Sequence, residues 1–389
     1  MAGGEPTTGP GATPGPGATN APGSWTHTGY AQQILLGDGA LHQLSEILRA
    51  VGARRVMLVT TAGRAASDEG GQVTRALGRA LASTFAEVSS HVPTGTVQAA
   101  VRQARRDGVD GVVSFGGGSC ADTAKAVCFF TEQEQGTPGA SFADRPTLPH
   151  ISVPTTYSGA ELTGFFGMTD PATRQKSGAG GPTITPIAAF YDPRLTLSTP
   201  ARVSAETGMN ALAHCVEAAW SPSRTPEAEA IALAGAARIV DALPRVVDDP
   251  SDLTARTDML SGSILAGRCL QNASMGVHHG LAQLVGGRTG IPHGLANAII
   301  LSHAIDYNAS AVPAEVRRIG EAIGSPDDPA GAVRALVVRL GLPTTLTEAG
   351  VDDDDLDAVA RLSQASPAVR ANPRPVGEDD ARAILESAC

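Results

Sequence analysis

Five of the nine histidines of this chain lie between positions 214 and 303, on or beside apolar segments typical of helices. His214 follows Asn210 by four residues, so both side chains should lie on one face of a helix. His279 and His293 come later, beside further apolar stretches. Neutral imidazoles are common transition-metal ligands and frequent proton carriers. We therefore expect these four residues to form a reaction centre, although a single histidine in an apolar helix is more often a hydrogen-bonded core residue.

A glycine-rich turn follows an expected strand at residues 111–115. It consists of Gly116, Gly117, Gly118 and Ser119 and opens a helical stretch. Glycines at a strand–helix turn let backbone N–H groups approach a ligand, and a helix N-terminus favours an anion. The turn is neither a G-x-G-x-x-G fingerprint nor a P-loop. It predicts a site for a cofactor pyrophosphate, although a triple glycine alone can also be just a tight turn.

Other polar residues accompany this turn. Thr155 and Thr156 follow the expected strand at 150–153, and hydroxyl groups at the carboxyl end of a parallel strand point into the ligand crevice. The same pair could instead cap a turn and helix. Asp122 lies three residues before Lys125, which equally allows a local ion pair on the helix.

The elements that must position these residues differ between the two halves of the chain. Strands are expected at 55–60, 85–90, 111–115 and 150–153, with helices between them, which predicts a parallel sheet. After Asp192 the strand signals vanish and Ala/Leu-rich helical stretches dominate, for example 271–287 and 295–308. We expect a nucleotide-binding α/β domain at 25–192 and a helical catalytic domain at 193–389. Residues 1–24 hold seven glycines and five prolines and are expected to form a disordered tail.

Composition narrows the class of protein. The 389 residues suffice for two domains, and no apolar run reaches the ~18 residues of a membrane span. The opening residues lack the basic start and apolar centre of a signal peptide. Five scattered cysteines fit reduced thiols in a cytoplasmic enzyme better than a disulfide framework. A net charge of −10 argues against a nucleic-acid partner.

These motifs resemble the iron-containing alcohol dehydrogenase superfamily, and within it the maleylacetate reductases, from about Tyr30 to the C-terminus. The superfamily has a Gly-Met-Asp-Ala-Leu-x-His frame followed by two further histidines, and His214, His279 and His293 match it. Asn210 stands where the family has its metal carboxylate. The resemblance implies the dehydroquinate synthase-like fold, a Rossmann-like parallel-sheet domain followed by an all-α domain.

The resemblance also implies NADH or NADPH as cofactor. Residues 116–125 match the superfamily's Gly-Gly-Gly-Ser-x-x-Asp-x-Ala-Lys motif, and Lys176 matches a lysine near the nicotinamide ribose. The residues expected to bind the cofactor are Gly116, Gly117, Gly118, Ser119, Asp122, Thr155, Thr156, Lys176 and Thr60. The chain departs from maleylacetate reductases at Gly180 and Gly181, where they usually carry Arg-Asp.

Asn210 bears on the chemistry, because it removes the one anionic metal ligand. Maleylacetate reductases share this asparagine and are thought to work without metal, so we expect metal to be absent. His214, His279 and His293 would then supply a proton and attract a carboxylate, whereas with a metal they would be its three ligands. Arg268 and Arg288 are further candidates for the carboxylate.

The resulting expectation is an NAD(P)H-dependent reductase of a small anionic enone or keto acid. The resemblance implies maleylacetate, reduced to 3-oxoadipate in aromatic-compound catabolism, and we expect a homodimer without nucleic-acid or membrane partners. Two alternatives stay open. A metal-dependent alcohol dehydrogenase acting on a small aldehyde or ketone is favoured by Asp122 and the run 292–297. A dehydroquinate synthase-type lyase would keep a metal and use the nucleotide as a transient oxidant.

Overall fold

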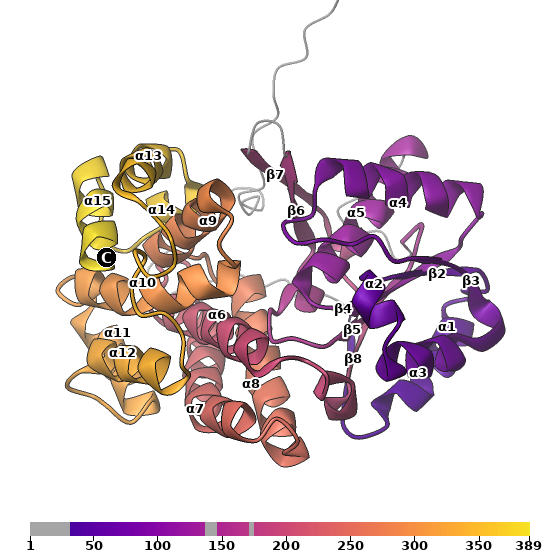
Figure 1. Ribbon diagram of the computed structural model, residues 1–389, viewed down its shortest axis with the longest axis horizontal. Coiled ribbons are helices and arrows are strands. Elements are labelled where there is room, and N and C mark those ends of the chain that lie inside the picture. Colours follow the sequence, from indigo (N-terminus) through magenta and orange to yellow (C-terminus); the bar gives the residue numbers. More distant parts are fainter. Residues whose placement is uncertain (1–31, 137–145, 171–174) are drawn as a thin grey trace, which may run out of the picture.

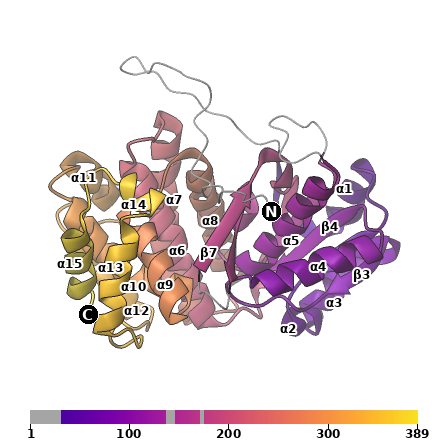
Figure 2. The ribbon, with the colours of Figure 1, turned by 90° about the horizontal axis from the view of Figure 1, so that it is seen from above.

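The computed structural model describes residues 32–136, 146–170 and 175–389. It has two lobes, of which the N-terminal one is built on a sheet and the C-terminal one on helices (Figure 1). Seen from above, the lobes lie side by side (Figure 2). The predicted architecture, a parallel-sheet domain followed by an all-α domain, is therefore confirmed. The tail expected at residues 1–24 lies outside the described residues.

Six parallel strands form the sheet of the first lobe, in the order β1-β8-β5-β4-β2-β3. They are β1 (Gln33–Leu36), β2 (Val56–Val59), β3 (Leu81–Phe85), β4 (Gly111–Gly116), β5 (His150–Pro154) and β8 (Ala188–Tyr191). Every residue of β2, β4, β5 and β8 is buried, as a parallel sheet covered on both faces requires.

Helices cover both faces of this sheet (Figure 1). α4 (Thr94–Arg106) and α5 (Gly118–Glu134) lie on one face, and α1 (Leu44–Ala50) and α3 (Asp68–Leu77) on the other. Each face has its own hydrophobic core: Val59 packs with Val97 of α4, whereas Leu58 packs with Leu44 of α1. Successive residues of a strand point to opposite faces, so one strand feeds both cores.

Two features of the first lobe differ from the sequence prediction. A strand was expected at 85–90, but the observed strand is β3, which ends at Phe85. Its last residue pair with β2 is Val59 and Phe85. As an edge strand it buries little of its outer side, so its sequence lacks a continuous apolar run. The second feature is an antiparallel hairpin of β6 (Phe165–Asp170) and β7 (Gln175–Gly180), which the sequence did not predict.

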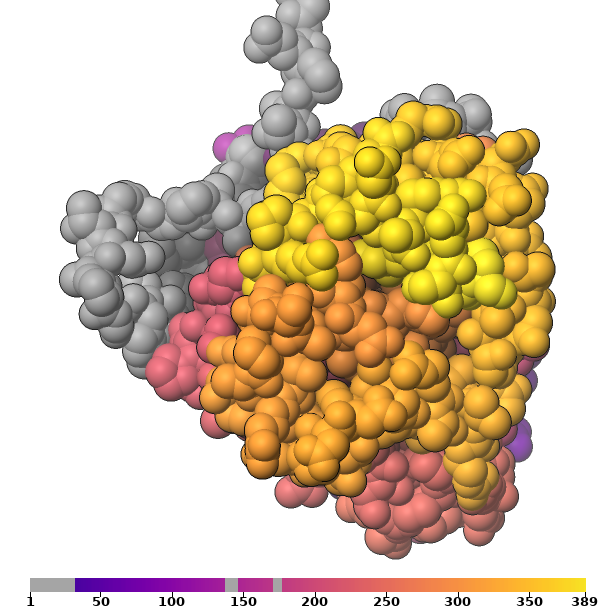
Figure 3. Space-filling model, turned by 90° about the vertical axis from the view of Figure 1, so that its left-hand side faces the viewer, coloured from indigo at the N-terminus to yellow at the C-terminus, as the bar shows by residue number. Residues whose placement is uncertain are grey.

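The second lobe contains only helices over residues 193–389, all of which the structure describes. The first lobe also contains the short α2 (Ala62–Ala65). The α-helices of the second lobe are α6 (Ala201–Trp220), α7 (Pro226–Asp248), α8 (Leu253–Asn272), α9 (Val277–Thr289), α10 (His293–Asn308), α11 (Pro313–Ala322), α12 (Pro329–Arg339), α13 (Asp353–Ser363), the short α14 (Pro367–Arg370) and α15 (Glu378–Ser387). The C-terminal residues, yellow in Figure 3, form the upper part of this lobe's outer face, and earlier residues, orange, form the part below them. No described helix is long and apolar enough to cross a membrane.

α6 is the central helix of this lobe and contacts α7, α8 and α10. Small residues allow this close packing: a Cβ at Gly208 would lie 2.5 Å from the Leu243 side chain of α7. The single helix expected at 271–287 is wrong, because α8 ends at Asn272 and α9 begins at Val277. The chain breaks there because the backbone N–H of Gly276 turns to a carboxylate of α6, described below.

The loop after β5 joins the two lobes. The Tyr157 backbone N–H donates to Thr207 of α6 at 3.4 Å, and Thr199 donates to the Thr155 carbonyl at 2.8 Å. The carboxyl end of the sheet therefore faces α6. The predicted domain boundary at Asp192–Pro193 falls between β8 and α6.

Candidate active site

Three helices of the second lobe bring the predicted histidines together. His214 lies in α6, His279 in the first turn of α9, and His293 at the start of α10. The rings of His214 and His279 stack with centroids 4.6 Å apart, and those of His279 and His293 lie 6.2 Å apart. The structure thus brings the three predicted histidines together, while their catalytic role stays a prediction.

Asn210 lies one helical turn before His214 and is buried. Its side-chain oxygen and the Nδ1 atom of His214 have no hydrogen-bond partner in the described part of the chain. Buried polar atoms are nearly always hydrogen-bonded, so these two mark a place for a polar ligand. Both belong to the face of α6 that carries the cluster.

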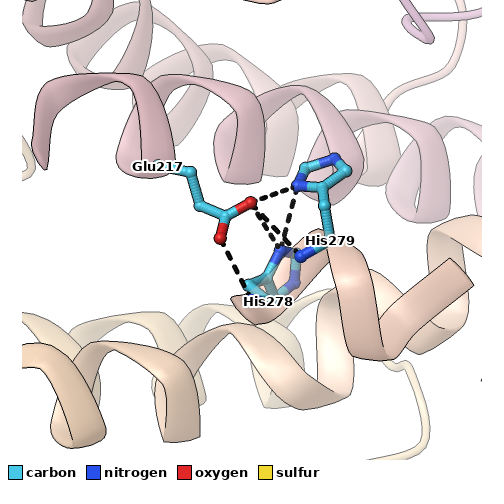
Figure 4. A group of neighbouring side chains, drawn as sticks. All are labelled: Glu217, His278 and His279. Carbon is cyan, nitrogen blue, oxygen red and sulfur yellow. Dashed lines mark hydrogen bonds and ion pairs between the residues drawn. The ribbon is translucent and has the colours of Figure 1, made fainter. Parts of the chain in front are cut away.

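Glu217 completes the cluster, although the sequence analysis did not single it out. One carboxylate oxygen accepts hydrogen bonds from the backbone N–H groups of Gly276 and His278, each at 3.0 Å. The other accepts from the His279 backbone N–H at 3.2 Å and from His279 Nδ1 at 2.6 Å (Figure 4). The available signal was its position: Asn210, His214 and Glu217 follow at i, i+4 and i+7, which is one helical face.

The surroundings of Glu217 and His214 shift the pKa values of both side chains and so decide the charge of each. Burial by itself would raise the pKa of Glu217, but hydrogen bonds from His278 and His279 outweigh it and hold that pKa well below its usual range. Glu217 is therefore a carboxylate. Burial, reinforced by the neighbouring His279 and His293, lowers the pKa of His214 well below its ordinary value. His214 is therefore neutral at pH 7.

The clustered histidines lack a free anionic partner for a transition metal. Within the described ranges, the group of three potential ligands whose atoms all lie within 4.8 Å of one another is Glu217, His278 and His279, and not the three clustered histidines. Each oxygen of Glu217 already accepts two N–H groups. His278 Nε2 lies 2.9 Å from the Asn297 carbonyl, to which it must donate. Asn210 adds only a neutral amide, so no anionic ligand is left over.

The glycine turn lies between β4 and α5, as predicted. Gly116 has a φ of +142°, which favours glycine, and Gly117 precedes the first turn of the 17-residue α5. A Cβ at Gly117 would lie 3.1 Å from Thr156 Oγ1, and one at Gly118 would lie 3.0 Å from Ser158 Oγ. The turn is thus closed on one side by the loop after β5, and a ligand phosphate would meet its backbone N–H groups at a helix N-terminus.

Hydroxyl groups surround this turn. The side-chain oxygens of Thr155, Thr156 and Ser158 are buried and, among the described residues, have no hydrogen-bond partner. Thr155 also donates its backbone N–H to the Gly116 carbonyl at 3.0 Å. Ser158 was missed in the sequence, where it is only one of several polar residues after a strand. These groups supply the donors and acceptors that a bound dinucleotide needs.

Other residues assigned to the cofactor have structural contacts. Asp122 pairs with Lys125 at 2.8 Å, which is the local ion pair that the sequence allowed. The buried Lys125 also donates to Thr163 at 3.1 Å. The Thr60 hydroxyl is buried and donates to the Phe115 carbonyl at 2.8 Å. The Lys176 backbone pairs with Thr169 in the hairpin, and its side chain lies outside what the structure describes.

The two candidate arginines have partners elsewhere. Arg288 lies in the last turn of α9 and forms an ion pair with Asp355 of α13 at 2.5 Å. It follows His279 by nine residues, or roughly 14 Å along a helix. Arg268 donates to Gln271 at 2.7 Å. Their predicted role in binding a carboxylate therefore gains no support from these contacts.

Comparison with known proteins gives the same assignment along nearly the whole chain. Residues 31–193 match the family described as iron-containing alcohol dehydrogenase, and residues 204–389 match the Fe-containing alcohol dehydrogenase family, C-terminal. The maleylacetate reductase of Pseudomonas knackmussii is 33% identical over 365 residues, which cover 94% of this chain and 97% of that protein.

Solved structures agree in fold. Maleylacetate reductase from Agrobacterium tumefaciens has a TM-score of 0.83 at 31% identity, covering 94% of this chain and 98% of that one. Sulfoacetaldehyde reductase from Bifidobacterium kashiwanohense, solved in complex with NAD+, has a TM-score of 0.85 at 26% identity, with coverage of 94% and 98%. The chain therefore belongs to the iron-containing alcohol dehydrogenase family and is an oxidoreductase similar to maleylacetate reductases.

Proposed function

We propose that this enzyme uses NADH or NADPH to reduce a small anionic enone or keto acid, such as maleylacetate to 3-oxoadipate, without a metal. Asn210 is the observation that carries the proposal, because a neutral amide stands where the family has its metal carboxylate, and the oxygens of the nearby Glu217 already accept N–H groups. Similarity to maleylacetate reductases over nearly the whole chain supports the substrate class.

The cofactor would bind at the turn of Gly116 to Ser119. The N–H groups at the start of α5 would meet its pyrophosphate, and the hydroxyls of Thr155, Thr156 and Ser158 would orient it. The likeness to a reductase solved with NAD+ supports this placement. Because the carboxyl end of the sheet faces α6, a dinucleotide held there would reach toward the histidine cluster.

The chemistry requires a hydride and a proton. A bound nicotinamide would supply the hydride to the substrate carbon, and the enolate formed from an enone, or the alkoxide formed from a keto group, would then need a proton. His279 is the proposed donor in its doubly protonated form, through Nε2, because its Nδ1 is held by Glu217 and gives its hydrogen to that carboxylate throughout. Asn210 would hydrogen-bond the polar end of the substrate with its otherwise unpartnered amide oxygen or its NH2 group. His214, being neutral, would accept or donate a hydrogen bond without repelling a protonated His279.

A second candidate is reduction of a small aldehyde that carries an acidic group. The structural likeness to sulfoacetaldehyde reductase favours it. In that reaction the hydride adds to the carbonyl carbon and the proton goes to its oxygen, so His279 would keep the same role.

A substrate panel distinguishes these candidates. Maleylacetate, other enones, keto acids and small aldehydes are tested with NADH and with NADPH, each with and without EDTA. The proposal expects the highest kcat/KM for maleylacetate or a close anionic enone, unaffected by chelator. A preference for aldehydes would instead establish the second candidate.

A further inference from the structure

We propose that Glu217 is a positioning residue that holds His279 in the tautomer protonated on Nδ1, so that Nε2 is the nitrogen presented to the reacting groups. Its catalytic consequence rests on the proposed function, whereas the tautomer itself can be measured without any substrate.

The contact between the two side chains determines the tautomer. A carboxylate only accepts hydrogen bonds, so His279 Nδ1, at 2.6 Å from Glu217, must carry a hydrogen. The side chains are 0% and 3% exposed, so water does not compete for this bond. Figure 4 shows Nε2 on the side of the ring that points away from Glu217. This is the same ring that stacks on His214.

The backbone of α9 fixes the carboxylate in turn. N–H groups of Gly276, His278 and His279 donate to Glu217, so the carboxylate cannot rotate away without losing several hydrogen bonds. The absence of a side chain at position 276 makes this approach possible: a Cβ there would lie 2.9 Å from Glu217 Oε1 and 2.7 Å from Asn372 Oδ1. The imidazole and its acceptor are thus held in one orientation by the same helix turn.

Capping of the N-terminus of α9 does not by itself explain why the Glu217 carboxylate is buried there. Asn372 already accepts the Val277 N–H at 3.2 Å, and a short polar residue at position 276 is the usual way to cap a helix. Burying a carboxylate is costly unless it is paired and hydrogen-bonded. A fully buried carboxylate reaching from α6, with one oxygen shared by a backbone N–H and an imidazole N–H, is what orientation of that imidazole requires.

His278 provides an internal reference. Its Nε2 donates to the Asn297 carbonyl at 2.9 Å, which assigns it the opposite tautomer, protonated on Nε2. Its ring therefore ties α9 to α10. Adjacent histidines of one helix should thus show opposite tautomers, which a spectrum of the intact protein can resolve.

The experiment is long-range ¹H–¹⁵N NMR of imidazole nitrogens in the full chain, with signals assigned through His278→Asn and His279→Asn. In the wild type, we expect His279 protonated on Nδ1 and His278 on Nε2. In Glu217→Gln, one amide oxygen faces four N–H donors, so His279 should lose its single tautomer while His278 keeps its own. Glu161→Gln is the matched control, because Glu161 is a buried carboxylate bound to Tyr191 and not to His279.

Kinetics provide the second readout. Glu217→Gln should lower kcat by tenfold or more while the KM for NADH stays within about twofold, because the cofactor turn lies in the other lobe. Finding neutral His279 protonated on Nε2 and not on Nδ1 in the wild type would overturn the proposal without any variant. So would an unchanged tautomer and kcat in a folded Glu217→Gln protein. If the chain reduces no maleylacetate, the proposed substrate fails and the tautomer assignment still stands or falls on the spectrum.

Discussion

The imidazole rings of His214 and His279 stack, with centroids 4.6 Å apart and planes inclined by 25°. Two stacked buried imidazoles cannot both carry a charge cheaply. Burial and the neighbouring His279 already lower the pKa of His214, whereas His279 has the Glu217 carboxylate beside it. The catalytic proton should therefore reside on His279.

Replacing His279 tests this assignment. His279→Ala should lower kcat by ~100-fold or more, the usual contribution of a general acid. His303→Ala is the control, because His303 lies in the same lobe and bonds Ser387 of α15 at 2.9 Å. Steady-state kinetics of both variants decide the matter. Equal kcat values for wild type and a folded His279→Ala protein would exclude His279 as the donor.

The cofactor turn should not tolerate an acidic side chain. Gly117→Asp adds a Cβ within 3.1 Å of Thr156 and a negative charge at the start of α5, where the pyrophosphate should bind. We expect NADH affinity to fall roughly tenfold or more, as measured by fluorescence titration. Gly95→Asp is the control, since no heavy atom lies within 4 Å of a Cβ there. Unchanged affinity in folded Gly117→Asp would remove the turn from the cofactor site.

A carboxylate at position 210 should create metal affinity. Asn210→Asp restores one anionic ligand four residues before His214, on the same helical face. We expect this variant to bind zinc in a titration followed by elemental analysis, and the added substitution His214→Ala to abolish that binding. Zinc binding by the wild type as strong as by the variant would show that Asn210 does not limit the site.

The sheet interior should make stability pH-dependent. Burial, reinforced by the charge of Lys125, lowers the pKa of His150 to about 3. The unfolded chain takes up this proton near pH 6.5, whereas the folded chain does not, so stability falls as the pH drops from 6.5 toward 3. The two-unit interval from pH 6.5 to 4.5 should cost roughly 2 kcal/mol. The free energy of unfolding, measured by denaturant titration at a series of pH values, should fall less steeply below pH 6.5 in His150→Gln than in the wild type. An equally steep fall in the variant would contradict this.

Periodicity and turn chemistry predicted the architecture and three of the strands around the site. β2, β4 and β5 are buried apolar segments bounded by turns, which makes them detectable in the sequence. The glycine turn was placed correctly because glycines between a strand and a helix are a recognisable pattern. β1 and β8 were not predicted from the sequence. The break between α8 and α9 was also missed, because it depends on a contact with α6 that is distant in sequence.

The candidate site was predicted in part. Asn210 and His214 share a helical face by spacing alone, whereas the proximity of His279 and His293 to them was expected from the density of histidines in this part of the chain and from the family resemblance. Glu217 was overlooked because a lone acid in a helix is usually solvated, and only the fold shows that its partners are N–H groups of α9. Arg288 had the right chemistry and a plausible place in the sequence, yet it lies at the opposite end of α9 and pairs with Asp355.

Metal dependence tests the account most directly. The protein is expressed and purified without added metal or chelator, its iron and zinc are measured by elemental analysis, and maleylacetate reduction with NADH is assayed before and after EDTA treatment. Because Asn210 replaces the family's metal carboxylate and Glu217 is engaged by N–H groups, we predict far less than one metal ion per chain and full activity after chelation. Stoichiometric iron or zinc, together with activity that is lost to EDTA and restored by the ion, would contradict the metal-free mechanism.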